Sequence, residues 1–186
     1  VFQKLAIDLQ VKKGLEKGAV LTIASFDEGE GKRTVALGLA KAIVSLGKTC
    51  AILDADGSME GFGASFPDRF PADRWGEKWF QPKVLPMIIA ELQAGYEVII
   101  CKTAPLAMQS SSTLLLSPAT LILLVLDSRK TKMKRLEEAG FLKEDLKLDN
   151  IYFLLNRDGY NPSLITAAYR SLKHIFSKNR PKSPIL

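Results

Sequence analysis

Five short apolar runs recur along the chain, and most of the segments between them show the spacing of helices. The runs are AVLTIAS (19–25), TCAILDAD (49–56), EVIIC (97–101), TLILLVLD (120–127) and NIYFLLN (150–156). Each is almost continuously apolar instead of alternating with polar residues, which is typical of strands that are buried on both faces of a parallel sheet. Strands of this kind need crossover connections, so the pattern already favours an α/β fold.

The segment 32–46 illustrates the helical pattern. Val35, Leu39 and Ile43 recur there at four-residue spacing, and Gly47 follows as a C-terminal stop. Further crossover helices are predicted at 83–95, 130–140 and 162–176. We therefore predict an α/β fold for 1–186 as a single domain, with a doubly wound, mainly parallel sheet that has helices on both faces.

Two segments do not fit this alternation. The stretch 57–82 contains two Trp, four Phe and several Gly and Pro without a clear period, and we interpret it as a long ordered aromatic loop. Its rings either form a partner surface or cover the edge of the sheet. The end of the chain, 177–186, is predicted to be a flexible basic tail.

Composition narrows the possible classes of protein. Of 186 residues, 47% are hydrophobic and 25% are charged, which is normal for a globular protein and argues against general disorder. Two cysteines are too few for a disulfide scaffold, and no run reaches the ~20 apolar residues of a membrane-spanning helix. The net charge of +6 is concentrated at 128–135 and in the tail. Such patches can meet phosphates, nucleic acid or anionic lipid, although a solvated basic helix is the simpler interpretation of 128–135.

The stretch SFDEGEGKRT (25–34) combines a strand end, a glycine-rich turn and a helix start, which is the arrangement that cradles phosphate. The phosphate-loop motif is G-x-x-x-x-G-K-[ST], and Gly31 and Lys32 match it. Phe26 stands at the first glycine position, and Arg33 stands where the magnesium-binding hydroxyl belongs. The second run ends with Asp54 and Asp56, two carboxylates at a strand tip where such sheets hold metal.

The order of LTIASFDEGEGKRT, AILDAD, VIICKTAPL, ATLILLVLDSRKTKMKRLEEAG and FLLNRDGY resembles the cytoplasmic domain of bacterial tyrosine kinases (BY-kinases). These are P-loop domains of the MinD/ParA-like class, found in the co-polymerases that govern capsule and exopolysaccharide chain length. The class typically carries an extra lysine in the loop where this chain has Asp27, and BY-kinases also lack it. The resemblance implies a P-loop NTPase-like fold and ATP or ADP as cofactor.

Carried over by position, the nucleotide loop comprises Gly29, Glu30, Gly31, Lys32, Arg33 and Thr34. Lys32 would hold the β and γ phosphates, and Asn156 and Arg157 match the region that cradles the base. Asp54 and Asp56 match the Asp-x-Asp motif and are the candidate magnesium ligands and, in an active enzyme, the candidate catalytic residues. The family's third motif has Asp where this chain has Lys102. The family's ring-forming arginines are replaced by Gln3 and Ala6, so self-association through that motif is not matched.

Arg33 and Lys102 therefore put two fixed positive charges near the metal position. They could replace the cation and hold a nucleotide without metal, or pair with Asp54 and Asp56 to close an empty site. Loss of the metal removes stabilisation of phosphoryl transfer on the order of several kcal/mol, so we expect catalysis to be absent or very slow.

Three functions are compatible with these residues. The first is a degenerate BY-kinase-like module that regulates exopolysaccharide or capsule synthesis or export, with membrane proteins of that machinery as partners and a cytoplasmic location, including the cytoplasmic side of an inner-membrane complex. The second is an active but atypical ATPase or tyrosine kinase. The third is a relative of the partition ATPases that binds DNA or membrane through its basic face. We favour the first, and nucleic acid is not the expected partner.

Overall fold

We analysed a computed structural model of the chain, which describes residues 1–186 except 14, 60–67, 72–73, 75–78, 109 and 157–186. The described strands form one six-stranded sheet in the order β3-β2-β4-β1-β5-β6. Every pairing in this sheet is parallel. The strands are β1 (Ala19–Ala24), β2 (Cys50–Asp54), β3 (Asp68–Pro71), β4 (Val98–Lys102), β5 (Leu121–Asp127) and β6 (Ile151–Asn156).

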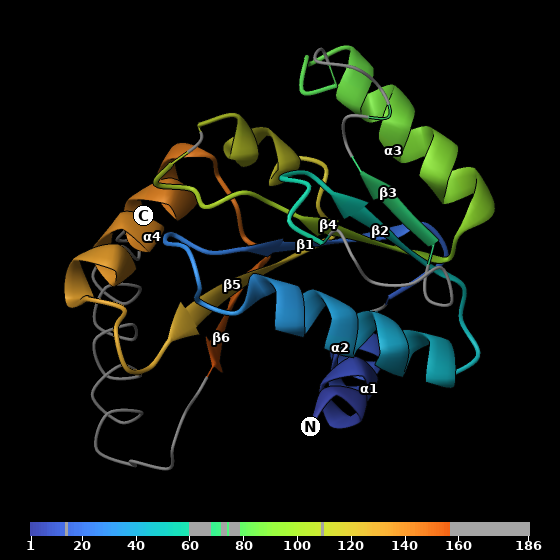
Figure 1. The fold of residues 1–186 in the computed structure, drawn as a ribbon, viewed down its shortest axis with the longest axis horizontal. Coiled ribbons are helices and arrows are strands. Elements are labelled where there is room, and N and C mark those ends of the chain that lie inside the picture. The colour runs from blue at the N-terminus through green and yellow to red at the C-terminus, as the bar shows by residue number, and fades with distance from the viewer. Residues whose placement is uncertain (14, 60–67, 72–73, 75–78, 109, 157–186) are drawn as a thin grey trace, which may run out of the picture.

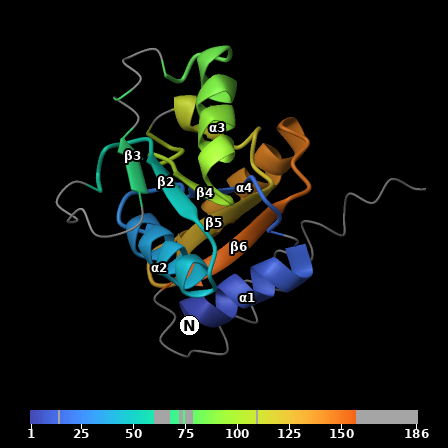
Figure 2. The ribbon, with the colours of Figure 1, turned by 90° about the vertical axis from the view of Figure 1, so that its right-hand side faces the viewer.

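Helices cover both faces of the sheet (Figures 1 and 2). On one face lie α1 (Phe2–Lys13) and α2 (Lys32–Ser45). On the other lie α3 (Val84–Gly95), the 3-10 helix η2 (Ser110–Leu115) and α4 (Met133–Asp145). The α/β fold with a doubly wound parallel sheet, predicted from the sequence, is confirmed.

The core lies in two layers because the central strands are buried on both sides. Every residue of β1, β2, β4 and β5 is buried. Alternate residues of β1 point to opposite layers: Leu21 packs in the cluster that contains α2, and Val20 packs in the cluster that contains α3. This is the burial that continuous apolar runs indicate, and it leaves the carboxyl ends of the strands to carry polar side chains.

Three details of the expected element pattern need correction. The first helix, α1, was not predicted: half of its sequence FQKLAIDLQVKK is polar, and it buries Ala6 and Leu9 against the core. Within the predicted aromatic loop, Asp68–Pro71 forms β3, which pairs with β2 at the edge of the sheet. The helix expected at 130–140 begins at Met133 and continues to Asp145.

Other expectations fall outside the described part of the chain. The predicted helix at 162–176 and the basic tail at 177–186 both lie there. Among the described residues, no helix combines the length and apolar character needed to cross a bilayer.

Candidate functional site

The candidate site lies where β1, β2 and β4 end. After β1 the chain forms a turn, Ser25–Gly31, and then enters α2 at Lys32. Gly29 and Gly31 have φ angles of 69° and 105°, a region that side chains disfavour. The first helical hydrogen bond joins Val35 N–H to Gly31 O at 3.0 Å, so the preceding amides of α2 have no acceptor within the helix. Together with the helix dipole, this is an anion-binding arrangement.

Lys32 is the loop's central cation. Its side chain is buried, with 8% of the residue exposed, and Nζ donates a hydrogen bond to Ser25 Oγ at 2.7 Å. Burial lowers the pKa of Lys32, and the nearby charge of Lys102 lowers it further. The charges of Asp56, Glu30 and Glu28 act in the opposite direction without reversing the shift. An incoming anion would stabilise the charged form further.

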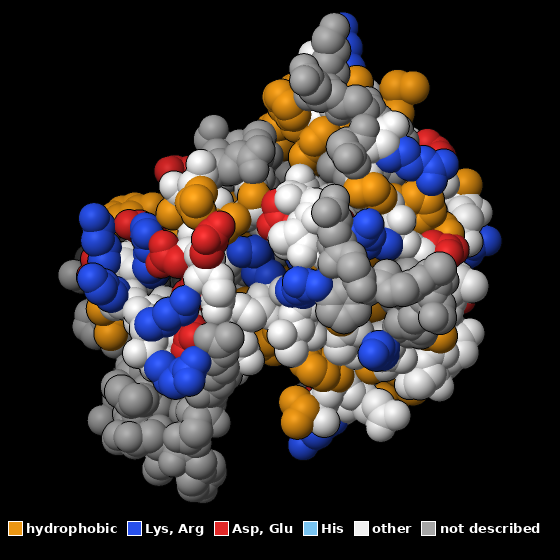
Figure 3. Space-filling view, viewed as in Figure 1, with side chains coloured by type: hydrophobic (Ala, Val, Ile, Leu, Met, Phe, Trp, Pro, Cys, Tyr) orange, Lys and Arg blue, Asp and Glu red, His pale blue; other side chains and the backbone are white. Residues whose placement is uncertain are grey.

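A pocket of about 340 Å³ opens beside this loop. On the same face of the molecule, Lys and Arg side chains lie among acidic ones (Figure 3). The lining combines loop backbone, three cations, two carboxylates and small polar groups: Glu28, Gly29, Gly31, Lys32, Arg33, Thr34, Asp56, Ser58, Lys102 and Pro105. This volume lies near the lower end of the range for small-molecule pockets.

Lys102 is the residue that departs most from a metal site. The parallel register places it directly opposite Asp54 across β2 and β4. Lys102 is 1% exposed and Asp54 is 0% exposed. The Nζ of Lys102 lies 3.0 Å from Oδ1 of Asp54, without hydrogen-bond geometry, and it donates a hydrogen bond to Oδ1 of Asp56. One ammonium thus lies between two carboxylates.

Other groups complete the environment of both acids. Asp54 Oδ2 accepts hydrogen bonds from Met59 N–H at 2.9 Å and from Arg69 at 3.4 Å. Asp56 Oδ1 accepts one from Ser58 N–H at 3.0 Å. Burial by itself would raise the pKa of Asp56, but the hydrogen bonds from Lys102 and Ser58 outweigh it, so the pKa lies below its usual value. Asp56 is thus held ionised beside an internal cation.

Magnesium does not fit these residues. The position between Asp54 and Asp56 is taken by Lys102, and Arg33 supplies a guanidinium where a hydroxyl ligand would be needed. Nor does the described part of the chain contain a group of three or more His, Cys, Asp or Glu side chains placed to hold a metal ion. A phosphate group does fit, because Lys32 and the loop glycines line the pocket and the first amides of α2 have no acceptor within the helix.

The sequence left two alternatives for Lys102 and Arg33: they replace the metal cation, or they pair with Asp54 and Asp56. The structure gives a different answer for each residue. Lys102 pairs with Asp54 and Asp56, as the second alternative required, yet the pocket beside them remains open. Arg33 and Thr34 are exposed and line that pocket. Arg33 is therefore placed to meet an anion in the pocket, which is a role that only the first alternative gave it.

Glu30 and Asn156 lie behind the loop instead of in the pocket. Glu30 is buried, and its carboxylate accepts hydrogen bonds from Asp27 N–H at 3.0 Å and from the Thr131 hydroxyl. Asn156 Nδ2 donates to Glu30 O at 2.9 Å. Both were assigned to nucleotide contact from the resemblance, and neither is among the pocket-lining residues. Arg157 lies outside the described residues.

Sequence reasoning missed several residues that build the site. Ser25, which holds Lys32, is in the quoted motif and could have been found there. Arg69 lies in the predicted aromatic loop, where no pattern indicated it. Lys130, Thr131 and Arg135 belong to the stretch interpreted as a solvated basic helix, yet all three contact the phosphate loop. Gln3 and Ala6, which stand where the family has its ring-forming arginines, both lie in α1. Gln3 is exposed and Ala6 is buried.

The loop geometry predicts a large effect for Gly31→Ala. A Cβ at Gly31 would lie 1.9 Å from Nδ2 of Asn156, and the φ of 105° is strained for any side chain. We expect the variant to lose about 2–4 kcal/mol of unfolding free energy in chemical denaturation, because clash and strain add. Gly47→Ala is the matched control, since Gly47 has a positive φ of 82° but its added Cβ would meet no heavy atom of the described residues within 4 Å. Equal losses in the two variants would contradict the packing of Asn156 on Gly31.

Comparison with known proteins supports the fold. No family model and no curated protein matches the sequence. Among solved structures, the kinase domain of Escherichia coli tyrosine kinase ETK aligns with a TM-score of 0.63 and 13% identity, covering 86% of this chain and 77% of that one. A putative plasmid partition protein from Borrelia burgdorferi bound to AMPPNP gives 0.59 and 18%, covering 90% and 84%. The pNOB8 ParA bound to nonspecific DNA gives 0.65 and 18%, covering 86% and 75%.

These similarities show that the chain has the P-loop fold shared by bacterial tyrosine-kinase domains and ParA-type ATPases. The predicted resemblance to this group is confirmed at the level of structure.

Proposed function

We propose that the chain is a nucleotide-binding domain that holds the phosphate chain of ATP or ADP without magnesium and regulates a partner instead of transferring phosphate. The observation that carries the proposal is the position of Lys102. Its ammonium lies between Asp54 and Asp56 at the pocket wall, where a P-loop enzyme would need a hydrated divalent cation.

The positive charge available to a ligand supports this assignment. Lys32, Arg33 and Lys102 all line the pocket, and the first-turn amides of α2 add partial positive charge. The negative charges of Asp54 and Asp56 are compensated within the protein by Lys102 and Arg69. An incoming phosphate chain would therefore meet the Lys32 ammonium and the first-turn amides of α2 at the pocket wall, with Arg33 beside them.

The same arrangement argues against turnover. Phosphoryl transfer depends on charge that neutralises the transferring oxygens and on a group that orients the attacking nucleophile. Asp54 and Asp56, the candidate catalytic residues, are both engaged by Lys102. We expect hydrolysis to be absent or very slow, and we therefore set aside the active-kinase alternative.

The resemblance to BY-kinase domains suggests the biological setting. On that basis we propose that the domain works on the cytoplasmic side of the membrane, with membrane proteins of exopolysaccharide or capsule synthesis or export as partners. In this setting nucleotide occupancy would be the signal and partner affinity the response.

The test is calorimetric titration of ATP and ADP into the protein in the presence of EDTA, together with a phosphate-release assay with magnesium. We expect saturable binding without measurable release. Absence of binding under every condition would refute the proposal, and steady phosphate release that depends on magnesium and Lys32 would restore the enzyme alternative.

The lowered pKa of Lys32 gives this binding a defined pH dependence. An anion favours the charged amine, so the pKa of Lys32 rises on binding and the complex takes up a proton at alkaline pH. Affinity should therefore fall as pH rises through the lowered pKa of the unliganded protein. Calorimetry in two buffers of different ionisation enthalpy measures the uptake. No uptake between pH 7 and about 10.5 would contradict the assignment.

One comparison favours the partition-type alternative. The pNOB8 ParA was solved with nonspecific DNA, and this chain carries exposed Arg129, Lys130, Lys132 and Lys134 at the start of α4. Our prediction that nucleic acid is not the partner is tested by fluorescence anisotropy with duplex DNA at low and high salt. Binding that weakens steeply with salt would support the DNA alternative instead.

A further inference from the structure

The backbone carbonyl groups of the phosphate loop are held from outside the pocket. Asp27 O accepts a hydrogen bond from Ser25 Oγ at 2.8 Å, and Glu28 O accepts one from Lys130 Nζ at 2.8 Å. Glu30 O accepts one from Asn156 Nδ2 at 2.9 Å. None of the donors Ser25, Lys130 and Asn156 is a pocket-lining residue.

The direction of each carbonyl fixes the direction of the following amide. No cis peptide bond occurs among the described residues, and in a trans peptide the C=O and N–H groups point to opposite sides. A carbonyl of Glu28 turned toward Lys130 therefore turns the N–H of Gly29 away from it, and Asn156 does the same for the N–H of Gly31. Both glycines line the pocket, so we expect amides turned away from the outer donors to lie on the side where an anion would bind.

The segment that supplies Lys130 is itself anchored. Asp127, at the end of β5, is buried, and its backbone carbonyl accepts hydrogen bonds from Lys130 N–H at 3.1 Å and Thr131 N–H at 2.9 Å. The Thr131 hydroxyl accepts one from Asp127 N–H and donates to Glu30, while Arg135 pairs with Asp27. Three side chains from one segment thus hold Asp27, Glu28 and Glu30 of the loop.

We infer that Lys130 is a positioning residue for phosphate: it holds the 28–29 peptide of the loop in the anion-binding orientation before a ligand arrives. The inference rests on the proposed function for the identity of the ligand, but the orientation of the loop does not depend on it. Lys130 acts through Gly29, since its own ammonium bonds a carbonyl and not the anion.

Lys130→Met tests this role, because Met keeps much of the aliphatic stem and removes the donor. Lys130 is exposed, so water can replace the lost hydrogen bond without fixing the direction of the peptide. We expect ATP affinity in EDTA to fall about tenfold, as for loss of one charge-assisted hydrogen bond that organises the site. Lys130→Arg should recover most of it. Lys132→Met is the matched control, since Lys132 is exposed on the same segment and carries the same charge.

The second readout is the order parameter of the Gly29 amide in the unliganded protein, from ¹⁵N relaxation. We expect about 0.85 in the wild type and in Lys132→Met, and below about 0.6 in Lys130→Met. A mobile Gly29 in the wild type would overturn the inference. Equal losses of affinity in Lys130→Met and Lys132→Met would also overturn it, since they would indicate an effect of net charge alone. A rigid loop that loosens only in Lys130→Met, in a protein that binds no ATP, would refute the proposed function while the positioning role stands.

Discussion

Replacing Lys102 with Met should lower the free energy of unfolding by about 3–5 kcal/mol, which is the usual cost of removing one partner from a buried ion pair. Lys102 and Asp54 are both fully buried, and Lys102 also holds Asp56. Met fills a similar volume, so the loss reflects carboxylates left without their cation and not a cavity. Urea denaturation followed by circular dichroism measures the effect.

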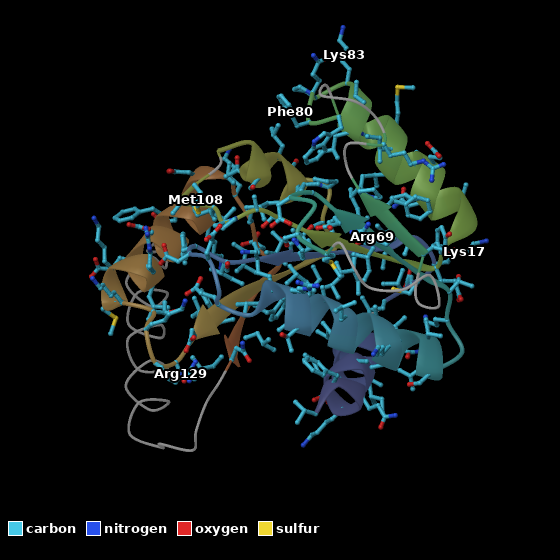
Figure 4. All side chains as sticks on the ribbon, in the orientation of Figure 1. Lys17, Arg69, Phe80, Lys83, Met108 and Arg129 are labelled. Atoms are coloured by element: carbon cyan, nitrogen blue, oxygen red, sulfur yellow. The ribbon has the colours of Figure 1, made fainter. Side chains whose placement is uncertain are left out.

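Two further variants identify the cause. Lys83→Met removes an exposed lysine at the start of α3, at the top of Figure 4, and should change stability by less than about 0.5 kcal/mol. Adding Asp54→Asn to Lys102→Met should recover part of the loss, because the double variant no longer contains a buried anion that has lost Lys102 and keeps only the longer contact with Arg69. A loss below about 1 kcal/mol for Lys102→Met would mean that the pair behaves like an exposed one and would contradict our description.

Replacing Lys32 with Met should abolish ATP binding while leaving the fold intact or more stable. We expect a loss in affinity of about 100-fold or more, because the pocket loses its central cation and the amides alone remain. The free energy of unfolding, in contrast, should stay the same or increase. The pKa of Lys32 is lowered by burial and by Lys102, so its charged form is unfavourable in the folded protein.

The free energy of unfolding should depend on pH for the same reason. Between the lowered native pKa and the unfolded value of 10.5, the folded protein binds fewer protons than the unfolded chain, so the wild type gains stability as pH rises through this window. The advantage of Lys32→Met should therefore be largest below the native pKa and should vanish above 10.5. Calorimetry for binding and urea denaturation at several pH values measure both effects. A destabilised Lys32→Met variant would show that Lys32 has a structural role instead.

Much of the fold could be predicted because strand burial leaves a strong local signal. Continuous apolar runs located β1, β2, β4, β5 and β6, and Gly47, with a φ of 82°, ends α2 as its position indicated. The edge strand β3 gave no such signal. It has four residues, one of them Pro71, and its residues are only partly buried or exposed, so it depends on pairing with β2.

Individual residues of the candidate site could be predicted from the sequence, but the contacts between them could not. Asp54 was identified from its place at a strand tip, and Lys102 was identified from the resemblance, which has Asp at that position. Whether Lys102 would pair with Asp54 depends on strand register, which is set by tertiary packing. The contacts of Lys130 and Arg135 with the phosphate loop join residues more than 100 positions apart, and no spacing in the sequence encodes them.

The same limit applies to the contacts of Asn156. The resemblance implied a role at the base of the nucleotide, whereas the structure places its amide against Gly31 and Glu30 O. A residue at the end of the edge strand β6 can reach the phosphate loop only because β5 and β1 bring that end alongside it. This relationship follows from the order of strands in the sheet and is invisible in local sequence.

The most direct test of the central claim is the ratio of ATP affinities measured with excess magnesium and with EDTA. If the Lys102 ammonium stands in place of the metal, the affinity without magnesium should equal or exceed the affinity with it, because magnesium partly neutralises the phosphates that Lys32 and Arg33 bind. Binding that requires magnesium, with affinity at least tenfold higher in its presence, would contradict the account.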